Sequence, residues 1–215
     1  DAPDSGFTDA ELRANVLTLL LAGEDTTANM LSWTMPFLGA DPALQDRLRD
    51  EACGVFGTAR ICPGFDDLRR LDRFEALATE ASRLKPTVPF NIFEPLEDVE
   101  LDGVELAAGT KVVFLKRPDM LEDRHFANAK AYDPDRWLRS RVADAGAHEP
   151  RAYLQFGAGA RVCPGRHLAG VEIRLVLSML MRNFRVTLAV DPVTIREVMA
   201  FTMTPDRMPV RLTAR

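Results

Sequence analysis

Apolar residues recur at helical spacing through the N-terminal part of the chain, and a polar pair marks where the helix starts. Thr8 and Glu11 have the spacing of a capping box, in which the side chains satisfy backbone N–H groups of the first turn. The apolar positions that follow repeat about every 3.6 residues, which is typical of a helix. The pattern predicts a long helix over 8–37.

Proline and glycine divide the next part of the chain into shorter elements. The sequence predicts a helix from Asp41-Pro42 to about Val55, a short helix over 65–71 and a further helix over 73–84 that ends before Pro86. The following β region covers 90–115. Asp102-Gly103 lies between two alternating runs, 99–101 and 104–106, and is a strong hairpin signal.

The last hundred residues begin with a long connection and return to regular structure. The connection and the loop after it cover 116–165, with short helices at best. An apolar helix, expected to be buried on most sides, is predicted over 164–181. Strands are predicted within 184–213. The fold class is therefore mainly α with small β-sheets (α+β).

Composition and charge exclude several classes of protein. The chain has 215 residues, 47% of them hydrophobic, so it can bury a sizeable core. A net charge of −5 argues against a nucleic-acid-binding protein. Three cysteines without a Cys-x-x-Cys pair make neither a disulfide framework nor a zinc site. With no signal peptide or membrane-spanning run, we expect a soluble cytoplasmic protein, although an anchor upstream stays open.

Positive charge is concentrated between residues 136 and 185. This stretch holds nine arginines and three acidic residues. Two interpretations stay open. The stretch is either a solvated basic face or a docking patch for an acidic electron-transfer partner, since complementary charge raises the encounter rate and orients the two proteins.

The segment from Phe156 to Gly165 contains the candidate chemistry. Its three glycines allow sharp turns and a close approach to a flat ligand. Pro164 suits the first turn of a helix, which would place Cys163 at a helix N-terminus, where a thiolate is favoured. Arg161 offers a positive fork to a carboxylate. These features suit the proximal side of haem, and the alternative is a loop before an ordinary helix with an inert cysteine.

The segment resembles the haem-thiolate loop of the cytochrome P450 family, Phe-x-x-Gly-x-Arg-x-Cys-x-Gly, at every fixed position. The resemblance implies that Cys163 is the axial ligand of the iron of haem b. It further implies cofactor contacts from residues of this loop and of the distal helix: Phe156, Gly157, Gly159, Arg161, Gly165 and Ala22.

Residues 22–27, Ala-Gly-Glu-Asp-Thr-Thr, are expected to interrupt the long first helix. Glycine, two acids and two threonines weaken helix propensity, and a Thr hydroxyl can bond back to the preceding turn. Taken alone, the segment could be a surface acid run beside a kink. It resembles the distal-helix motif of the family, which implies that Thr26 and Asp25 relay protons to dioxygen, assisted by Glu24.

Glu80 and Arg83 lie three residues apart, on one face of the predicted helix over 73–84. Alone they would form a surface ion pair of little energetic weight. They match the Glu-x-x-Arg motif of the family, which an arginine from the later connection joins. The resemblance identifies that arginine as Arg136 and implies a structural network behind the haem.

Four apolar residues resemble positions that face the substrate in the family, with core packing as the alternative: Val88, Phe90, Phe201 and Met203. Their character suggests an apolar substrate. Many members also carry a basic residue in the strand after the Glu-x-x-Arg helix. Residues 90–101 contain no Arg, Lys or His, so Arg161 is the clear candidate partner of a haem propionate.

The resemblance covers the chain nearly from end to end, but only as the C-terminal part of the family fold. Residues 1–215 are therefore expected to form a single partial domain, incomplete without an N-terminal half. The implied activity is insertion of one oxygen atom from O2 into an apolar small molecule. Electrons would come from NAD(P)H through a ferredoxin or flavoprotein reductase docking near 136–185. The alternatives are a peroxide-using or isomerase-type haem-thiolate enzyme, and a truncated, inactive fragment that binds haem weakly.

Overall fold

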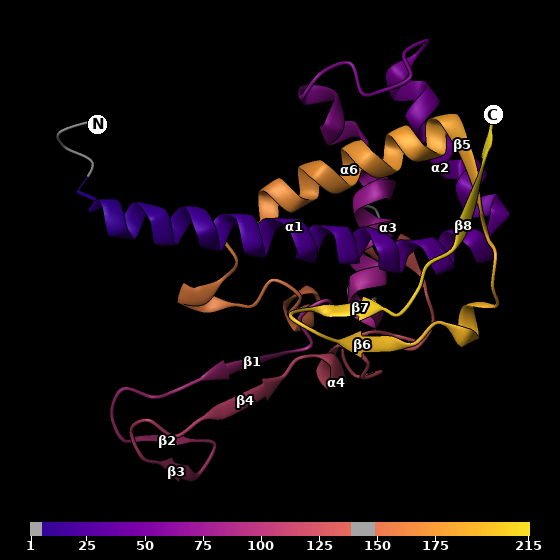
Figure 1. The fold of residues 1–215 in the computed structure, drawn as a ribbon. Helices are drawn as coiled ribbons and strands as arrows, with labels where there is room; N and C mark the ends of the chain where they lie inside the picture. The colour runs from indigo at the N-terminus through magenta and orange to yellow at the C-terminus, as the bar shows by residue number, and fades with distance from the viewer. Residues whose placement is uncertain (1–5, 139–148) are drawn as a thin grey trace.

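The computed structural model describes residues 6–138 and 149–215. Part of the predicted basic stretch, including Arg139 and Arg141, lies outside these residues. Within them, no helix combines the length and the apolarity that a membrane crossing requires. The fold is mainly helical with small antiparallel sheets, as the sequence predicts (Figure 1).

Helix α1 (Asp9–Ala40) is the longest element, and the predicted capping box starts it. The Thr8 side chain accepts a hydrogen bond from the Glu11 N–H, and the Glu11 carboxylate accepts one from the Thr8 N–H. The helix runs unbroken through residues 22–27, so the expected interruption is wrong. The N-terminal half of α1 extends beyond the other helices (Figure 1). Its apolar side chains are exposed: Leu12, Val16, Leu17, Leu19, Leu20 and Leu21.

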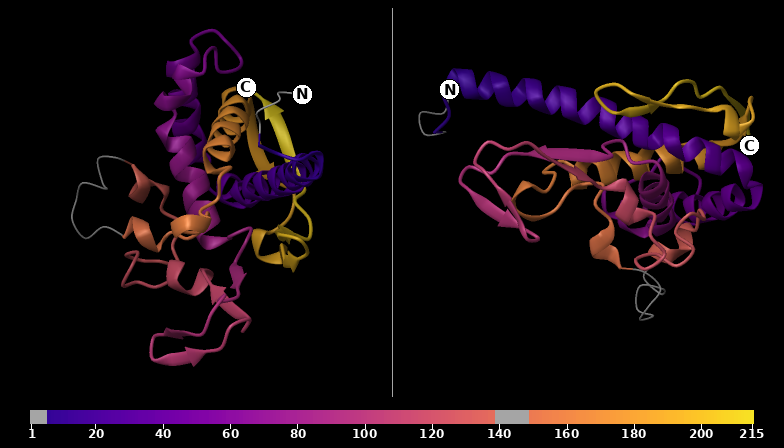
Figure 2. Two further views of the ribbon diagram at one scale, coloured as in Figure 1. Left: turned by 90° about the vertical axis from the view of Figure 1, so that its left-hand side faces the viewer. Right: turned by 90° about the horizontal axis from the view of Figure 1, so that it is seen from below.

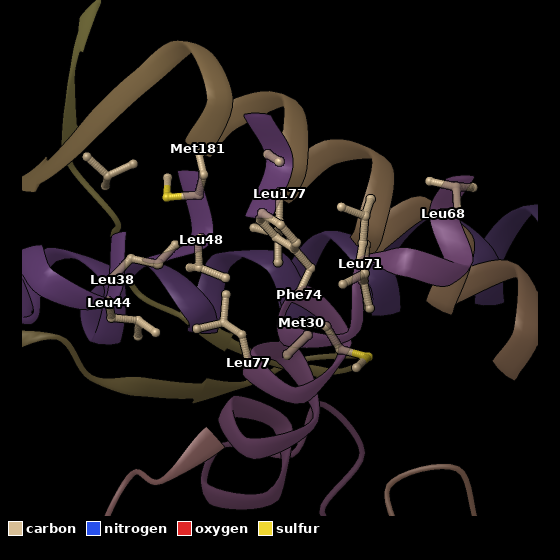
Figure 3. Close-up of a cluster of buried hydrophobic side chains, with 14 of the residues drawn as sticks. Met30, Leu38, Leu44, Leu48, Leu68, Leu71, Phe74, Leu77, Leu177 and Met181 are labelled. Carbon is tan, nitrogen blue, oxygen red and sulfur yellow. The ribbon is translucent and has the colours of Figure 1, made fainter. Parts of the chain in front are cut away.

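The core lies where the C-terminal half of α1 meets three further helices (Figure 3). These are α2 (Pro42–Phe56), α3 (Asp72–Leu84) and α6 (Arg166–Asn183). Leu48, Phe74 and Leu177 are fully buried at their junction. Helix α6 buries only one face, whereas Leu168 and Leu175 are exposed. The expectation that this helix is buried on most sides is therefore wrong for this chain.

Four antiparallel strand pairs account for the sheets in the described residues. Strand β1 (Phe90–Phe93) pairs with β4 (Val112–Leu115), and β2 (Val99–Leu101) with β3 (Val104–Leu106) across the predicted Asp102-Gly103 turn. The β1–β4 and β2–β3 pairs extend away from the helices (Figure 2). Strand β5 (Phe184–Leu188) pairs with β8 (Val210–Ala214), and β6 (Glu197–Met199) with β7 (Met203–Pro205).

The connections contain only short helical turns. They are η1 (Asp66–Arg70), α4 (Arg117–Met120), η2 (Pro134–Trp137), η3 (Pro150–Ala152), η4 (Gly159–Arg161) and η5 (Pro192–Thr194). Four of these turns, α4 and η2 to η4, belong to the predicted connection over 116–165. This segment returns the chain from the β region to the start of α6.

The β6–β7 hairpin, which the sequence does not predict, is held against α1. The Trp33 indole N–H donates to the Met203 carbonyl at 3.0 Å, and the Asn29 amide donates to the Thr202 hydroxyl at 2.6 Å. The Met203 N–H donates to the Thr87 carbonyl at 2.7 Å. The hairpin therefore connects the long helix to the segment that follows α3.

Candidate functional site

Residues 156–165, here called the Cys loop, form a tight turn closed by a backbone hydrogen bond. The Cys163 N–H donates to the Phe156 carbonyl at 2.8 Å. Gly157 and Gly159 have φ of +74° and +64°, a region that side chains with a Cβ rarely adopt. An added Cβ on Gly159 would meet no atom within 4 Å. The loop thus leaves open space beside its backbone.

Cys163 does not lie in the first turn of a helix. Helix α6 begins at Arg166, and Gly165 occupies the N-cap position. Gly165 has an ordinary φ of −81°, so only two of the three glycines use their conformational freedom. Cys163 is a half-buried free thiol. The predicted helix over 164–181 therefore starts two residues late, and the local argument for a thiolate rests on the loop rather than on α6.

The predicted proton-relay segment lies on α1, on the border between its exposed and buried halves. The Thr26 hydroxyl donates to the Ala22 carbonyl at 2.6 Å, one turn earlier. Glu24 and Asp25 are exposed, whereas Thr27 is buried. The back-bonded hydroxyl is present as the sequence predicts, but the helix does not open into a groove around it.

Glu80, Arg83 and Arg136 meet in the interior. Arg83 donates to both Glu80 carboxylate oxygens, at 2.8 and 2.9 Å, and the Arg136 Nε donates to Glu80 Oε1 at 3.1 Å. Glu80 and Arg83 are 0% exposed and Arg136 is 3% exposed. Burial acts to raise the pKa of Glu80, but the hydrogen bonds and charge of Arg83, the Asp133 N–H and the charge of Arg136 together outweigh burial and lower it.

Two partners of Glu80 have no signal in the sequence. The Trp137 indole N–H donates to Glu80 Oε2 at 2.8 Å, and the Asp133 backbone N–H donates to Glu80 Oε1 at 3.0 Å. Both come from the segment around η2, so this carboxylate fixes the connection against α3. Five hydrogen bonds to one buried carboxylate make a structural network, with no group free to react.

The four residues predicted to face a substrate occupy different environments. Val88 and Phe90 are half-buried at the start of β1. Phe201 is 67% exposed at the tip of the β6–β7 hairpin, whereas Met203 is 6% exposed. The Met203 carbonyl is the acceptor of Trp33 described above, so packing and anchoring account for its burial.

A hollow of about 490 Å³ lies between the Cys loop, the start of α3 and the start of α6. Phe156 and Val162 line its loop side, Glu75 its α3 side, and Arg166 and His167 its α6 side. Acidic and basic groups therefore face each other here. The surface predicted to be basic over 136–185 therefore carries charges of both signs around this hollow.

The donor set suits a cofactor that needs one protein ligand. In residues 6–138 and 149–215, no three His, Cys, Asp or Glu side chains gather as a metal site. Cys163 stands alone as a soft ligand, and Arg161 is exposed beside it with no ion pair to a described residue. An added Cβ on Gly165 would lie 3.8 Å from the Cys163 sulfur, so the glycine keeps a side chain away from it. A haem iron takes one axial thiolate and a cation for its carboxylates, so these residues fit haem.

The chain matches one protein family over nearly its whole length. The model of the Cytochrome P450 family matches residues 1–212. Among curated proteins, the chain is similar to the pentalenene oxygenase of Streptomyces avermitilis (35% identity over 209 residues, 96% of this chain and 45% of that protein). It is also similar to the mitochondrial sterol 26-hydroxylase of Homo sapiens (31% over 198 residues, 92% and 37%).

A solved structure has the same fold. The crystal structure of the cytochrome P450DA heme domain superposes with a TM-score of 0.87 and 27% identity, covering 99% of this chain and 47% of that one. The chain thus spans less than half the length of these proteins.

Proposed function

The chain belongs to the cytochrome P450 family, and on that basis we propose that it forms the haem-thiolate part of a monooxygenase. The reaction inserts one oxygen atom from O2 into an apolar small molecule. The observation that carries this proposal is the Cys loop, where a closed turn with two positive-φ glycines presents a single half-buried thiol. The curated relatives named above, an oxygenase and a hydroxylase, support the reaction class.

Cys163 and Arg161 would hold the cofactor, haem b. The Cys163 thiolate would ligate the haem iron, and the Arg161 guanidinium would pair with a haem carboxylate. When bound, the haem supplies the activation of oxygen, which a thiolate ligand favours by donating electron density. The remaining proposed cofactor contacts would come from Phe156, Gly157, Gly159, Gly165 and Ala22.

Thr26 and Asp25 supply protons from α1. The Thr26 hydroxyl is held by the Ala22 carbonyl, and the Asp25 carboxylate beside it is exposed to solvent. Glu24 assists from the same turn. Because positioned proton donors typically contribute about a hundredfold or more to a rate, these two groups are the main acid catalysts of the proposal.

The substrate would lie against Val88, Phe90, Phe201 and Met203. The hydrogen bond from Trp33 holds Met203 of the β6–β7 hairpin against α1. An apolar lining selects for an apolar substrate, since burial of its surface supplies the binding energy.

Electrons would arrive from NAD(P)H through a ferredoxin or flavoprotein reductase. Of the described cations between 136 and 185, Arg151 and Arg166 are exposed, whereas Arg174 and Arg185 are paired with Glu75 and Asp46. Arg151 and Arg166 are therefore the docking candidates. Reversing their charge should lower the rate of reduction and its dependence on salt.

A peroxide-using enzyme is the second candidate, and the Asp25-Thr26 pair favours oxygen activation over it. Turnover under isotopically labelled O2 separates the two. The monooxygenase incorporates label from O2 and requires the electron donor. A peroxide-using enzyme incorporates unlabelled oxygen from added hydrogen peroxide and keeps its rate in a Thr26→Val variant.

Haem binding by these 215 residues alone is expected to be weak. The N-terminal half of α1 leaves six leucine and valine side chains exposed. Nothing in the described residues covers this surface, which borders the proposed site through Ala22. An equilibrium titration with haemin measures the affinity, and tight binding of one haem per chain would contradict the expectation.

A further inference from the structure

Two arginines from the β5–β8 sheet meet on one carboxylate of α2. The Arg185 guanidinium donates to Asp46 Oδ1 at 2.8 Å, and a terminal nitrogen of the Arg215 guanidinium lies 2.9 Å from the same oxygen. Arg215 directly follows β8, and its backbone N–H donates to the Asn183 carbonyl at the end of α6, at 2.9 Å. The single acceptor atom therefore holds the two guanidiniums side by side, where α2, β5 and β8 come together (Figure 1).

Arg49 brings a third positive charge to the same place. It follows Gln45 by one turn of α2, and the Gln45 amide is bonded to both the N–H and the carbonyl of Val186 in β5, at 2.9 Å each. Residues three and four apart share a helix face, so Arg49 lies on the face of α2 that carries Gln45 and Asp46. Its Nε is buried and has no hydrogen-bond partner among the described residues.

The donors of Arg215 are buried and largely unused. Its side chain is 9% exposed, and no atom of the described residues accepts a hydrogen bond from its Nε or from either terminal nitrogen. The contact with Asp46 is thus an ion pair without the alignment of a hydrogen bond. Burial and repulsion from Arg185 and Arg49 lower the pKa of Arg215, and Asp46 opposes this lowering only in part. Because buried polar groups are normally hydrogen-bonded, this guanidinium lacks an acceptor.

The charges at this place do not balance. Among the described residues, Asp46 is the one carboxylate that pairs with any of the three arginines. Asp50, the next acid along α2, is exposed and pairs with none of them. Arg49, Arg185 and Arg215 therefore leave two positive charges in excess. The side chains of Asp46 and Arg185 are 54% and 42% exposed, so an anion can reach the cluster from solvent.

We propose that Arg49, Arg185 and Arg215 form a binding site for a dianionic phosphate group, either free phosphate or the terminal phosphate of a small soluble molecule. Guanidinium groups bind phosphate oxygens through paired, charge-assisted hydrogen bonds. The three groups come from α2, β5 and the end of β8, which suits a tetrahedral ligand better than a planar carboxylate. Thr213 lies opposite Arg185 in the strand register and on the same face of the sheet, so its hydroxyl adds a neutral donor.

The proposed phosphate site is separate from the Cys loop. Helix α6 begins beside that loop and ends at Asn183, which anchors Arg215. The 18 residues of α6 span about 27 Å at 1.5 Å per residue. Phosphate binding therefore neither requires haem nor rests on the proposed function, and the haem-free chain can be used to test it.

Isothermal titration of the haem-free chain with inorganic phosphate, at pH 8 and constant ionic strength set with chloride, measures binding directly. We expect one saturable site per chain. Arg215→Met and Arg49→Met should each weaken binding by about tenfold or more, since each removes charged hydrogen bonds. Arg47→Met is the matched control, because Arg47 is an exposed arginine two residues from Arg49 and so on another face of α2. No saturable binding, or equal weakening in Arg47→Met, would overturn the proposal.

Three further ligands test which chemistry the site selects. Dimethyl phosphate has one charge and two free oxygens, so it should bind at least about tenfold more weakly than phosphate. Equal binding of dimethyl phosphate would mean unspecific attraction and would overturn the site. Glycerol 3-phosphate that binds as tightly as phosphate supports the terminal phosphate of a larger molecule, whereas its exclusion supports free phosphate. Binding to phosphatidic acid vesicles without binding to either soluble ligand would overturn the choice of a soluble ligand.

Urea unfolding separates a binding site from a purely structural cluster. Phosphate should raise the midpoint of the unaltered chain and of Arg47→Met, and it should leave Arg215→Met nearly unchanged. In phosphate-free buffer, removing one of three neighbouring positive charges should not lower the midpoint. A lower midpoint in that buffer together with unaltered phosphate affinity would show that the arginines are structural and would overturn the proposal. Arg49→Met and Arg185→Met provide the same test if Arg215→Met fails to fold.

Discussion

The Glu80 carboxylate and the Arg83 guanidinium form two parallel hydrogen bonds, at 2.8 and 2.9 Å, in a site from which solvent is fully excluded. Arg136 adds a third charged partner from a segment more than fifty residues away in sequence. Each charge of the network is compensated only by the other charges. Removing one partner should therefore lower the free energy of unfolding strongly, because it leaves an uncompensated charge in the interior.

Glu80→Gln should destabilise the chain by about 3–5 kcal/mol, because it leaves Arg83 and Arg136 buried without their anion. Urea unfolding followed by circular dichroism measures the loss. Asp67→Asn is the control, since it breaks an exposed ion pair with Arg70 and should cost less than about 1 kcal/mol. Equal losses in the two variants would contradict a buried structural network.

Stability should fall in acid through Glu197, which joins the β6–β7 hairpin to α4 and to the end of α3. Burial opposes its ionisation, but hydrogen bonds from Arg117, at 2.7 and 2.9 Å, and from Lys85 hold its pKa below the ordinary 4.5. A carboxylate with a lowered folded pKa stabilises the fold above its unfolded pKa, and this contribution is lost as the pH falls through the folded pKa.

Urea midpoints measured between about pH 6 and pH 3 should therefore decrease, with the steepest part below the ordinary carboxyl pKa. Glu197→Gln should be less stable at the upper end and show a shallower decrease. Glu80 contributes with the same sign. A Glu197→Gln curve parallel to that of the unaltered chain would show that this carboxylate is not linked to folding.

Thr26→Val and Asp25→Asn should each lower the rate of product formation by roughly a hundredfold while leaving haemin affinity unchanged. The reason is that both groups deliver protons and neither holds the cofactor. Thr18→Val is the matched control, because the Thr18 hydroxyl makes the same kind of bond, to the Ala14 carbonyl at 2.8 Å, one turn outside the motif. A Thr18→Val variant as slow as Thr26→Val would point to helix stability instead.

Trp33→Phe should loosen the β6–β7 hairpin, because it leaves the buried Met203 carbonyl without its donor. The expected cost is about 1–3 kcal/mol of stability. The KM for an apolar substrate should rise more than kcat falls, since the hairpin carries proposed substrate contacts. Steady-state kinetics measures the changes in KM and kcat separately. An unchanged KM would show that the hairpin does not contribute to substrate binding.

Short sequence motifs predicted those elements whose start or turn depends on residues close together in the sequence. The capping box of Thr8 and Glu11 placed the start of α1 within one residue, and Asp102-Gly103 placed the β2–β3 turn. Pro164 misled the prediction of α6. The bond from Cys163 to Phe156 closes the loop first, and the helix then starts at Arg166.

Contacts between distant segments could not be predicted in this way. The anchoring of Met203 by Trp33 and the burial of Lys116 against Gln155 join residues that are 170 and 39 positions apart. Neither residue pair has a spacing that identifies it. The motif residues of the candidate site can be proposed from the sequence because their types and spacing are specific, whereas the residues that support them emerge only from packing.

The central claim is that Cys163 is the haem ligand, and the ferrous–CO spectrum of the haemin-loaded chain tests it most directly. The account predicts a red-shifted Soret band that is lost in Cys163→Ser and kept in Cys53→Ser and Cys62→Ser, whose thiols lie outside the Cys loop. The same band in Cys163→Ser, or its absence from the unaltered chain when haemin is bound, would contradict the claim.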